Sequence, residues 1–171
     1  MPAHFKVYDG HYPHFVTSAT IHWIPAFRRD YYFRVMTDSL GYCIKCRGLI
    51  LHAYVIMPDH FHLICTQTDG DLPQLLGNIK GYTAHLVAEK IRQEDRSSWV
   101  RAIERAGGVW QDGYHPEQIH SIKFCEQKMR YMHDNPVRAG FVTNPCDWKY
   151  SSAGFYYEDR ASIQPLEVID W

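Results

Sequence analysis

The sequence predicts an α+β fold in which helices cover an antiparallel sheet. Short segments rich in β-branched or alternating apolar residues, which are typical of strands, occur at residues 15–23, 46–57 and 60–66. Segments with apolar residues at helical spacing stand between and after them. The resulting order is β-α-β-β-α-β with one added C-terminal helix, which is the pattern of a ferredoxin-like domain.

The chain begins with a strand and a helix. Residues 15–23 predict the first strand, which Pro25 ends. Residues 26–40 predict a helix that Gly41 closes. Its apolar residues at helical spacing are Phe27, Tyr31, Val35, Met36 and Leu40.

Two strands and a long helix follow. Residues 46–57 and 60–66 predict the second and third strands, and Pro58 marks the boundary between them because it has no N–H for a ladder. Residues 68–71 read as a loop, and residues 72–92 predict a helix. Its expected apolar stripe is Leu75, Leu76, Ile79, Leu86, Val87 and Ile91.

The last third is harder to divide. Residues 93–108 are charged and read as a polar excursion that leads to a short fourth strand at Val109–Trp110. His115–Glu117 resembles a helix start, with Pro at an early position, and this helix stops at Asn135–Pro136. Its expected inward residues are Ile119, Ile122, Cys125, Met129 and Met132.

Length and composition indicate an ordinary globular protein. We expect residues 1–171 to form a single domain with a C-terminal tail from about residue 137. No apolar run approaches the roughly 20 residues that span a bilayer. Residues 1–10 have no apolar core of a signal peptide, so we expect a cytoplasmic location and no membrane partner.

The five cysteines do not suggest a disulfide framework, because their number is odd and no secretion signal accompanies them. Cys43 and Cys46 have the spacing of zinc ligands, but no second such pair exists. Free thiols and a redox or zinc module are the two interpretations.

His60 and His62 are candidate metal ligands. They stand two apart in a predicted strand, so their imidazoles point to the same face and can converge on one divalent ion. Two ligands are too few to define a site, and a half-exposed polar face is the alternative.

Tyr131 and Asn135 share a face of the last predicted helix, four residues apart. Tyr131 lies off the expected apolar stripe, so packing does not obviously explain it. The alternatives are a tyrosine at the core margin and an asparagine that caps the helix before Pro136.

Together these motifs resemble a known family. His60-Phe-His62, within Met-Pro-Asp-His-Phe-His-Leu-Ile, resembles the His-hydrophobe-His (HUH) motif of the single-tyrosine, IS200-like transposases. Three further segments resemble the branch called REP-associated tyrosine transposases, and the likeness extends over roughly residues 12–155. They are Trp110-Gln-Asp-Gly-Tyr114, Tyr131-Met-His-Asp-Asn-Pro-Val-Arg-Ala-Gly140 and Asp147-Trp-Lys-Tyr-Ser-Ser152.

The resemblance implies roles for the candidate residues. His60 and His62 would bind Mg²⁺ or Mn²⁺ with Asn135 as third ligand, and Tyr131 would be the nucleophile. His120 and His133 remain alternative ligands. Tyr82 and Tyr114 are the reserve nucleophiles, although phosphate contact or base stacking suits them better.

The implied partner is single-stranded DNA, in relatives a palindromic repeat folded as a hairpin. The net charge of −1 is unusual for a nucleic-acid-binding protein, so the positive charge must be local. Solvated surface is the ordinary interpretation of scattered basic residues. We expect a basic, aromatic groove formed by Arg28, Arg29, Lys80, Tyr82, Lys123, Lys128, Arg130 and Arg138.

The implied activity is a metal-dependent transesterase that nicks and rejoins single-stranded DNA through a 5′-phosphotyrosine. The alternatives are a domesticated hairpin binder that does not cleave and a metal-dependent nuclease that uses water. Relatives act as dimers or monomers, and both stay open. Trp148 and Tyr150, in the tail, either stack on bases or close over the core.

Overall fold

The computed structural model describes residues 12–68, 71–94 and 98–169. Four strands form one sheet in the order β2-β3-β1-β4, with every neighbouring pair antiparallel. The strands are β1 (His14–Ala19), β2 (Leu49–Ile56), β3 (His60–Gln67) and β4 (His115–Gln118). The predicted α+β, ferredoxin-like fold is confirmed.

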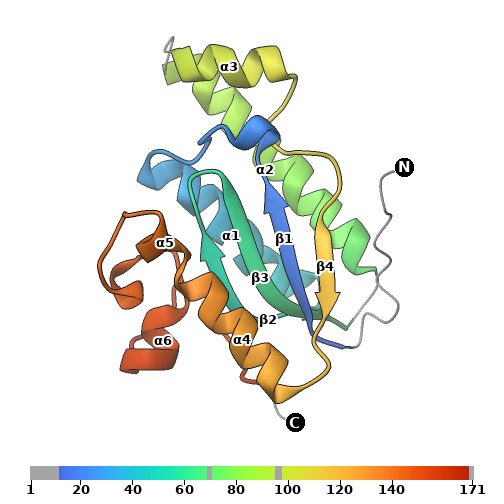
Figure 1. Cartoon of the computed structure of the whole chain (residues 1–171). Coiled ribbons are helices and arrows are strands. Elements are labelled where there is room, and N and C mark those ends of the chain that lie inside the picture. Colours follow the sequence, from blue (N-terminus) through green and yellow to red (C-terminus); the bar gives the residue numbers. More distant parts are fainter. Residues whose placement is uncertain (1–11, 69–70, 95–97, 170–171) are drawn as a thin grey trace.

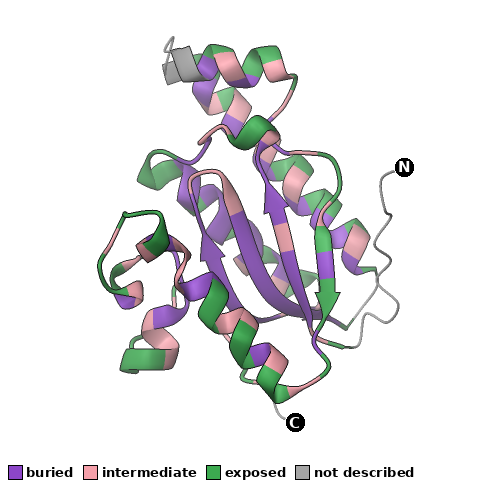
Figure 2. Ribbon diagram, in the orientation of Figure 1, coloured by how far each residue is buried: buried purple, intermediate pink, exposed green. Residues whose placement is uncertain are grey.

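The sheet separates two hydrophobic cores. Helices α1 (Asp30–Cys46) and α2 (Leu72–Glu94) lie on one face, and α4 (Ile122–His133) lies on the other (Figure 1). Because side chains alternate along a strand, each strand contributes to both cores. Figure 2 shows the central strands as the most continuously buried part of the molecule. The larger core includes Val16, Met36, Phe61, Leu63 and Ile79, and the smaller core includes Phe15, Val55, Ile64, Cys125 and Met132.

The first predicted strand is shorter than expected. β1 ends at Ala19, and Ile21–Trp23 form a 3₁₀ turn, η1. Helix α1 also begins and ends later than predicted. Gly41 lies inside it, where a Cβ atom would be 2.7 Å from Oε1 of Gln164, so this glycine allows a close approach. Gly48, with φ 69°, follows the end of the helix instead.

The centre of the chain agrees with the prediction. β2, β3 and α2 occupy the expected segments to within three residues, and Pro58 lies in the turn between the two strands. The Met57 N–H closes this turn by donating to the His60 carbonyl at 2.8 Å. Residues 69–70 of the expected loop lie outside the described residues.

The prediction of a polar excursion at residues 93–108 was wrong in part, because this segment contains helix α3 (Ser98–Ala106). Val100 and Ile103 are buried and their charged neighbours are exposed, so this is a short amphipathic helix. Residues 95–97 of the excursion lie outside the described part of the chain.

The fourth strand was also misplaced. At the predicted position only Trp110 pairs, in an isolated bridge with Thr20. The helix start expected at His115–Glu117 is β4, which pairs with β1 at the sheet edge. An edge strand tolerates Pro116, because the missing N–H faces away from the ladder. The helix begins instead at Ile122, where the Ser121 side chain accepts a hydrogen bond from the Phe124 N–H.

Helix α4 ends at His133, two residues before the predicted stop, and a short helix α5 (Asn135–Arg138) follows. Cys125 and Met132 are buried as expected, whereas Ile122 is 53% exposed. In the described part of the chain, no helix has the length and apolar character needed to cross a membrane.

The tail docks on the free edge of β2. It contains a 3₁₀ turn, η2 (Pro145–Asp147), and helix α6 (Ala153–Glu158). The Ile56 N–H donates to the Tyr150 carbonyl at 2.8 Å, and the Ser152 N–H donates to the Tyr54 carbonyl at 2.9 Å. The tail thus covers backbone groups that an edge strand otherwise leaves open. The Tyr150 ring stacks on Phe33 with centroids 4.1 Å apart, which favours closure over the core.

Candidate active site

Strand β3 places His60 and His62 side by side on the face that α4 covers. Their ring centroids are 4.9 Å apart. Phe61 and Leu63 point to the opposite face and belong to the larger core. The predicted sharing of one face by the two imidazoles is therefore confirmed.

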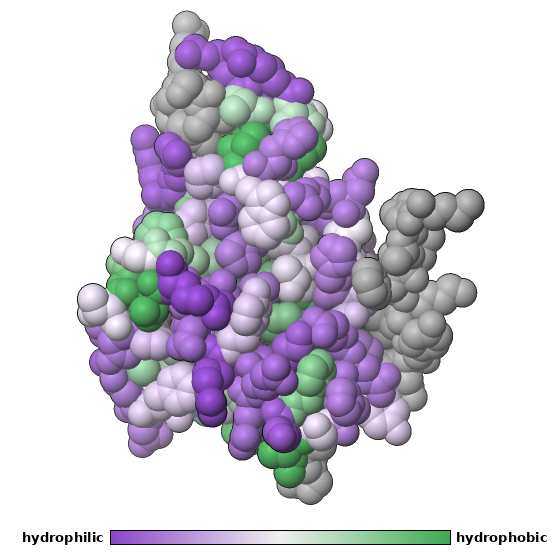
Figure 3. Space-filling view, viewed as in Figure 1, coloured by the Kyte–Doolittle hydropathy of each residue, from purple (hydrophilic) through white to green (hydrophobic). Residues whose placement is uncertain are grey.

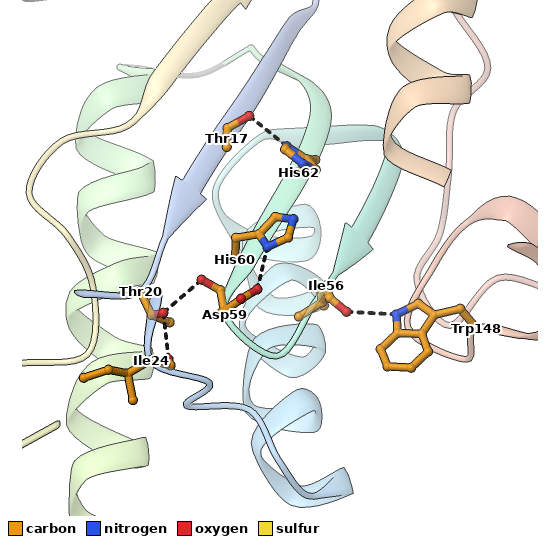
Figure 4. A network of polar contacts seen from close by, with 8 residues as sticks. All are labelled: Thr17, Thr20, Ile24, Ile56, Asp59, His60, His62 and Trp148. Carbon is orange, nitrogen blue, oxygen red and sulfur yellow. Dashed lines mark hydrogen bonds and ion pairs between the residues drawn. The ribbon is translucent and has the colours of Figure 1, made fainter. Parts of the chain in front are cut away.

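The two ring nitrogens of His62 have different surroundings. Its Nδ1 lies 2.7 Å from Oγ1 of Thr17, the residue directly across the β1–β3 ladder (Figure 4). Its Nε2 is buried and has no hydrogen-bond partner among the described residues. Burial, followed by the nearby charges of His60, Arg138 and Lys128, lowers the His62 pKa to about 3. A neutral imidazole with an orphaned buried nitrogen is the form that binds a metal ion.

His60 is oriented by the residue before it. The Asp59 Oδ1 atom lies 2.7 Å from His60 Nδ1, as Figure 4 shows. A carboxylate on one ring nitrogen fixes the orientation of a ligating histidine and directs the other nitrogen to the metal.

Tyr131, on α4, lies over the same region. Its ring centroid is 5.5 Å from that of His62 and 6.2 Å from that of Phe15. The side chain is 46% exposed, so a substrate can reach it. The Arg138 guanidinium carbon lies 4.6 Å from the centre of the Tyr131 ring, and Nη2 of Arg138 donates to the Tyr131 carbonyl at 3.0 Å. A phenol, a guanidinium and two imidazoles therefore meet on one face.

Asn135 follows Tyr131 by one helical turn. Its Nδ2 donates to the Tyr131 carbonyl at 3.2 Å, so its amide oxygen is not used in this bond. Asn135 and His60 line the same pocket of about 440 Å³, together with Pro25, Met57, Pro58, Asp59, Arg138, Ala139 and Phe141.

The two alternative ligands have other surroundings. His133 is fully buried, with Nδ1 3.0 Å from the Tyr157 hydroxyl and Nε2 2.8 Å from Oγ of Ser152. His120 is exposed before α4 and stacks on Phe124. The structure thus brings Asn135 to the neighbourhood of His60, and it gives both nitrogens of His133 other partners.

The candidate donors here are two imidazoles and one amide oxygen, which are groups that divalent ions accept as ligands. Within residues 12–68, 71–94 and 98–169, no group of three or more His, Cys, Asp or Glu side chains is arranged to hold a metal. The buried Nε2 of His62, which has no partner among these residues, is the observation that fits an ion at this place.

The expected basic groove divides between the two faces of the sheet. Lys128 and Arg138 lie near His62, and their charges contribute to its low pKa. Arg130 and Lys123 are exposed on α4, and Arg28 and Arg29 are exposed just before α1. In Figure 3 the α4 face is largely hydrophilic, with scattered hydrophobic patches.

Lys80 and Tyr82 are not part of that surface. They lie on α2, which packs on the opposite face of the sheet. Lys80 donates to the carbonyls of Gln111 and Gly113, so it braces the segment before β4. Tyr82 lines a separate groove between α1 and α2.

The reserve residues gain no support from their surroundings. Burial raises the pKa of Tyr114 to about 12, which makes this phenol a poor nucleophile at neutral pH.

Cys43 is buried in α1 and Cys46 is exposed one turn later. Burial also raises the pKa of Cys43, which disfavours the thiolate that zinc requires.

Sequence reasoning missed the residues that orient the imidazoles. Asp59 directly precedes His60, and that adjacency was a usable signal. Thr17 is 45 residues away from His62 in the chain, so only the strand register reveals it. Trp23, whose ring lies 5.6 Å from that of His60, was also missed.

Known proteins resemble this chain in sequence and in fold. The family model described as "Transposase IS200 like" matches residues 12–135, which is more than half of the chain. The chain belongs to the IS200-like transposase family. The family suggested by the sequence motifs is thereby confirmed, and the matched segment of this IS200-like protein includes His60, His62, Tyr131 and Asn135.

Two curated relatives come from the REP-associated branch. A Haemophilus influenzae protein named as a REP-associated tyrosine transposase is 29% identical over 121 residues, which are 70% of this chain and 64% of the relative. The REP-associated tyrosine transposase of Escherichia coli K12 is 26% identical over 132 residues, or 73% of this chain and 64% of the relative. This chain thus spans less than two thirds of the length of the relatives it matches.

The fold has a solved counterpart. A structure of a REP-associated tyrosine transposase bound to a REP hairpin superposes with a TM-score of 0.68 at 18% identity, covering 100% of this chain and 95% of that chain. The shared fold of this IS200-like protein therefore includes the tail beyond residue 135, which the family model does not match.

Proposed function

We propose that this IS200-like protein is a DNA strand transferase that cleaves single-stranded DNA beside a hairpin and holds the 5′-phosphate on Tyr131. The observation that carries the proposal is the position of the Tyr131 ring, 5.5 Å from the His62 ring, whose buried Nε2 has no partner in the part of the chain that the structure describes. The proposal pairs a phenol that can attack phosphorus with an imidazole nitrogen that can bind an activating metal ion.

The reaction exchanges one phosphodiester for another. The Tyr131 oxygen forms a bond to phosphorus, the bond from phosphorus to the 3′-oxygen breaks, the phenol proton passes to solvent, and the leaving 3′-oxygen takes up a proton. Because the tyrosyl ester retains the phosphate, a 3′-hydroxyl can later reverse the step without ATP.

The residues around the Tyr131 phenol would orient the phosphate and stabilise its charge. A divalent ion such as Mg²⁺ or Mn²⁺, held by His60, His62 and Asn135, would supply Lewis-acid stabilisation of the charge on the phosphate oxygens. Thr17 and Asp59 orient the two imidazoles through the bonds of 2.7 Å at their Nδ1 atoms. Arg138 adds fixed positive charge beside the Tyr131 ring.

The basic surface beside Tyr131 and a structure of the same fold support DNA as the partner. Lys123, Lys128, Arg130 and Arg138 give α4 and its extension a basic surface next to Tyr131. A protein of the same fold is described as bound to a REP hairpin. Phosphate contacts from these residues predict salt-sensitive binding.

A covalent-adduct assay tests the proposal. Labelled single-stranded DNA with a hairpin is incubated with the protein and Mg²⁺ or Mn²⁺, and the label is followed into a denaturant-resistant protein band. We expect an adduct with the wild type, none with Tyr131→Phe, and an undiminished adduct with the control variants Tyr82→Phe and Tyr114→Phe.

Each other outcome selects a different function. Free 5′-phosphorylated ends without an adduct indicate a nuclease that uses water. Hairpin binding without cleavage in either metal indicates a binder of repetitive DNA. An adduct that persists in Tyr131→Phe shows that another residue is the nucleophile.

A further inference from the structure

Two consecutive residues before α1 adopt a left-handed backbone conformation. His22 has φ 52° and ψ 23°, and Trp23 has φ 55°. Both carry a Cβ atom that crowds the backbone in this region, so the turn stores strain. Such strain persists only where the surrounding structure imposes it, and it concentrates at functional sites.

Hydrogen bonds of Thr20 join the strained turn to the turn that carries His60, and we call these bonds the clamp. Thr20 Oγ1 lies 2.8 Å from the Ile24 carbonyl oxygen and 2.9 Å from the Asp59 carbonyl oxygen, so its hydroxyl can donate to either (Figure 4). The Thr20 N–H also donates to the Asp59 carbonyl, at 2.8 Å. Within the turn, the Trp23 N–H donates to the Thr20 carbonyl at 3.0 Å. Trp23 and His60 are thus held at the same clamp.

The clamp holds a large aromatic side chain in solvent. Trp23 is 54% exposed, whereas Ala26 and Phe27, a few residues later, are completely buried. The Trp23 ring meets the His60 ring at 5.6 Å between centroids, with an angle of 65° between their planes. The indole therefore contributes little to the core and remains available beside a proposed metal ligand.

Three ring contacts link four side chains on this face of the sheet. Tyr131 is in contact with His62, His62 with His60, and His60 with Trp23, at centroid distances of 5.5, 4.9 and 5.6 Å. A phosphate placed over the two imidazoles would lie near the phenol, which contacts His62, and near the indole, which contacts His60. Because the attacking and leaving oxygens of phosphoryl transfer lie roughly in line, the leaving 3′-oxygen would face away from Tyr131, and Trp23 is the exposed ring at the other end of these contacts.

We infer that Trp23 is a base-stacking residue that holds the nucleotide whose 3′-oxygen leaves. This inference rests on the proposed strand-transfer function and assigns a subsite to it. Stacking on an indole accepts any base, because every base has a π-face. Trp23 would therefore position the strand without selecting its sequence.

Abasic oligonucleotides test this assignment. The rate of adduct formation is measured for a hairpin substrate and for versions that lack one base at each position around the cleavage site. We expect Trp23→Ala to lower the rate on intact DNA about 10- to 100-fold, in line with the loss of one stacked base. Loss of the base 5′ to the cleaved bond should slow the wild type equally and should not slow Trp23→Ala further.

Two variants serve as controls. Trp23→Phe keeps a stacking ring and should retain most of the rate. Tyr42→Ala removes another exposed aromatic, 57% exposed on α1, and should behave as the wild type. Thermal unfolding of each variant verifies the fold.

The outcomes separate the two ideas. If removal of that base slows Trp23→Ala as much as the wild type while adducts still form, the stacking assignment is overturned and strand transfer stands. The same oligonucleotides are also bound to the Tyr131→Phe protein. If the wild type forms no adduct but binding depends jointly on Trp23 and that base, strand transfer fails and stacking stands. If neither rate nor binding shows the joint dependence, Trp23 has no such role.

Discussion

Thr17 and His62 face each other across the β1–β3 ladder, with Thr17 Oγ1 2.7 Å from His62 Nδ1. This contact leaves the buried Nε2 of His62 as the ring nitrogen without a hydrogen-bond partner among the described residues. Strand register alone brings the two residues together, so the pairing of the sheet and the chemistry of the site are linked.

Replacement of Thr17 should weaken metal binding. Thr17→Val removes the hydroxyl that orients His62 and keeps the β-branched shape, so we expect Mn²⁺ affinity to fall about 10- to 100-fold. Titration calorimetry or Mn²⁺ electron paramagnetic resonance measures this. Thr17→Ser keeps the hydroxyl and should bind as the wild type; equal affinity of Thr17→Val and the wild type would contradict the orienting role.

Asn135 should also contribute to metal affinity. Asn135→Ala removes the amide oxygen that we assign as third ligand. We expect the Mn²⁺ affinity to fall by about 10-fold or more, which is the size of the effect when a group that supports a metal site is removed. His120→Ala is the matched control, because His120 is exposed and stacks on Phe124. A loss confined to the His120 variant would reassign the third ligand.

Thr20 joins the strained turn to the His60 turn. Thr20→Val leaves the Ile24 and Asp59 carbonyls without the hydroxyl, and we expect the free energy of unfolding to fall by about 1–3 kcal/mol. Adduct formation should fall further than the lost stability explains, because both Trp23 and His60 are released. Urea unfolding and the adduct rate are compared; a stable variant with an unchanged rate would show that the clamp is dispensable.

His133 should make the protein sensitive to acid. Burial lowers its pKa to about 4, below the unfolded value of about 6.5. The unfolded state therefore binds the proton first, and stability falls as the pH drops from about 7 to 4, by up to about 3 kcal/mol. Below the folded-state pKa this contribution is lost. Urea unfolding at several pH values should show that His133→Gln loses less unfolding free energy on acidification than the wild type does. If the unfolding free energy of both proteins depends on pH in the same way, His133 is not the origin of the acid sensitivity.

Arg138 should contact a phosphate of the bound strand. We expect Arg138→Gln to weaken single-stranded DNA binding and to reduce the slope of log K against log salt by about 0.7, the value for one phosphate contact. Lys45→Gln, at the end of α1, is the control and should leave the slope unchanged. Fluorescence anisotropy at several salt concentrations measures both slopes, and equal slopes for Arg138→Gln and the wild type would place the DNA elsewhere.

Local signals predicted the fold where they were strong. β2, β3 and α2 follow from their apolar patterns, and the face shared by His60 and His62 follows from the strand period. The segment from residue 93 to 121 was predicted poorly. There a short amphipathic helix carries many charges, and β4 contains Pro116, which resembles a helix start and is tolerated because β4 is an edge strand.

By itself the sequence determined the order of the elements as far as α2, the family motifs, and the identity of His60, His62, Tyr131 and Asn135 as candidates, because periodicity and short motifs are properties of neighbouring residues. Only the tertiary structure decided which residues meet. Register places Thr17 on His62, a strained turn places Trp23 on His60, and opposite faces of the sheet separate Lys80 from Arg138. Contacts between distant segments depend on how the elements pack, and packing is a property of the whole chain.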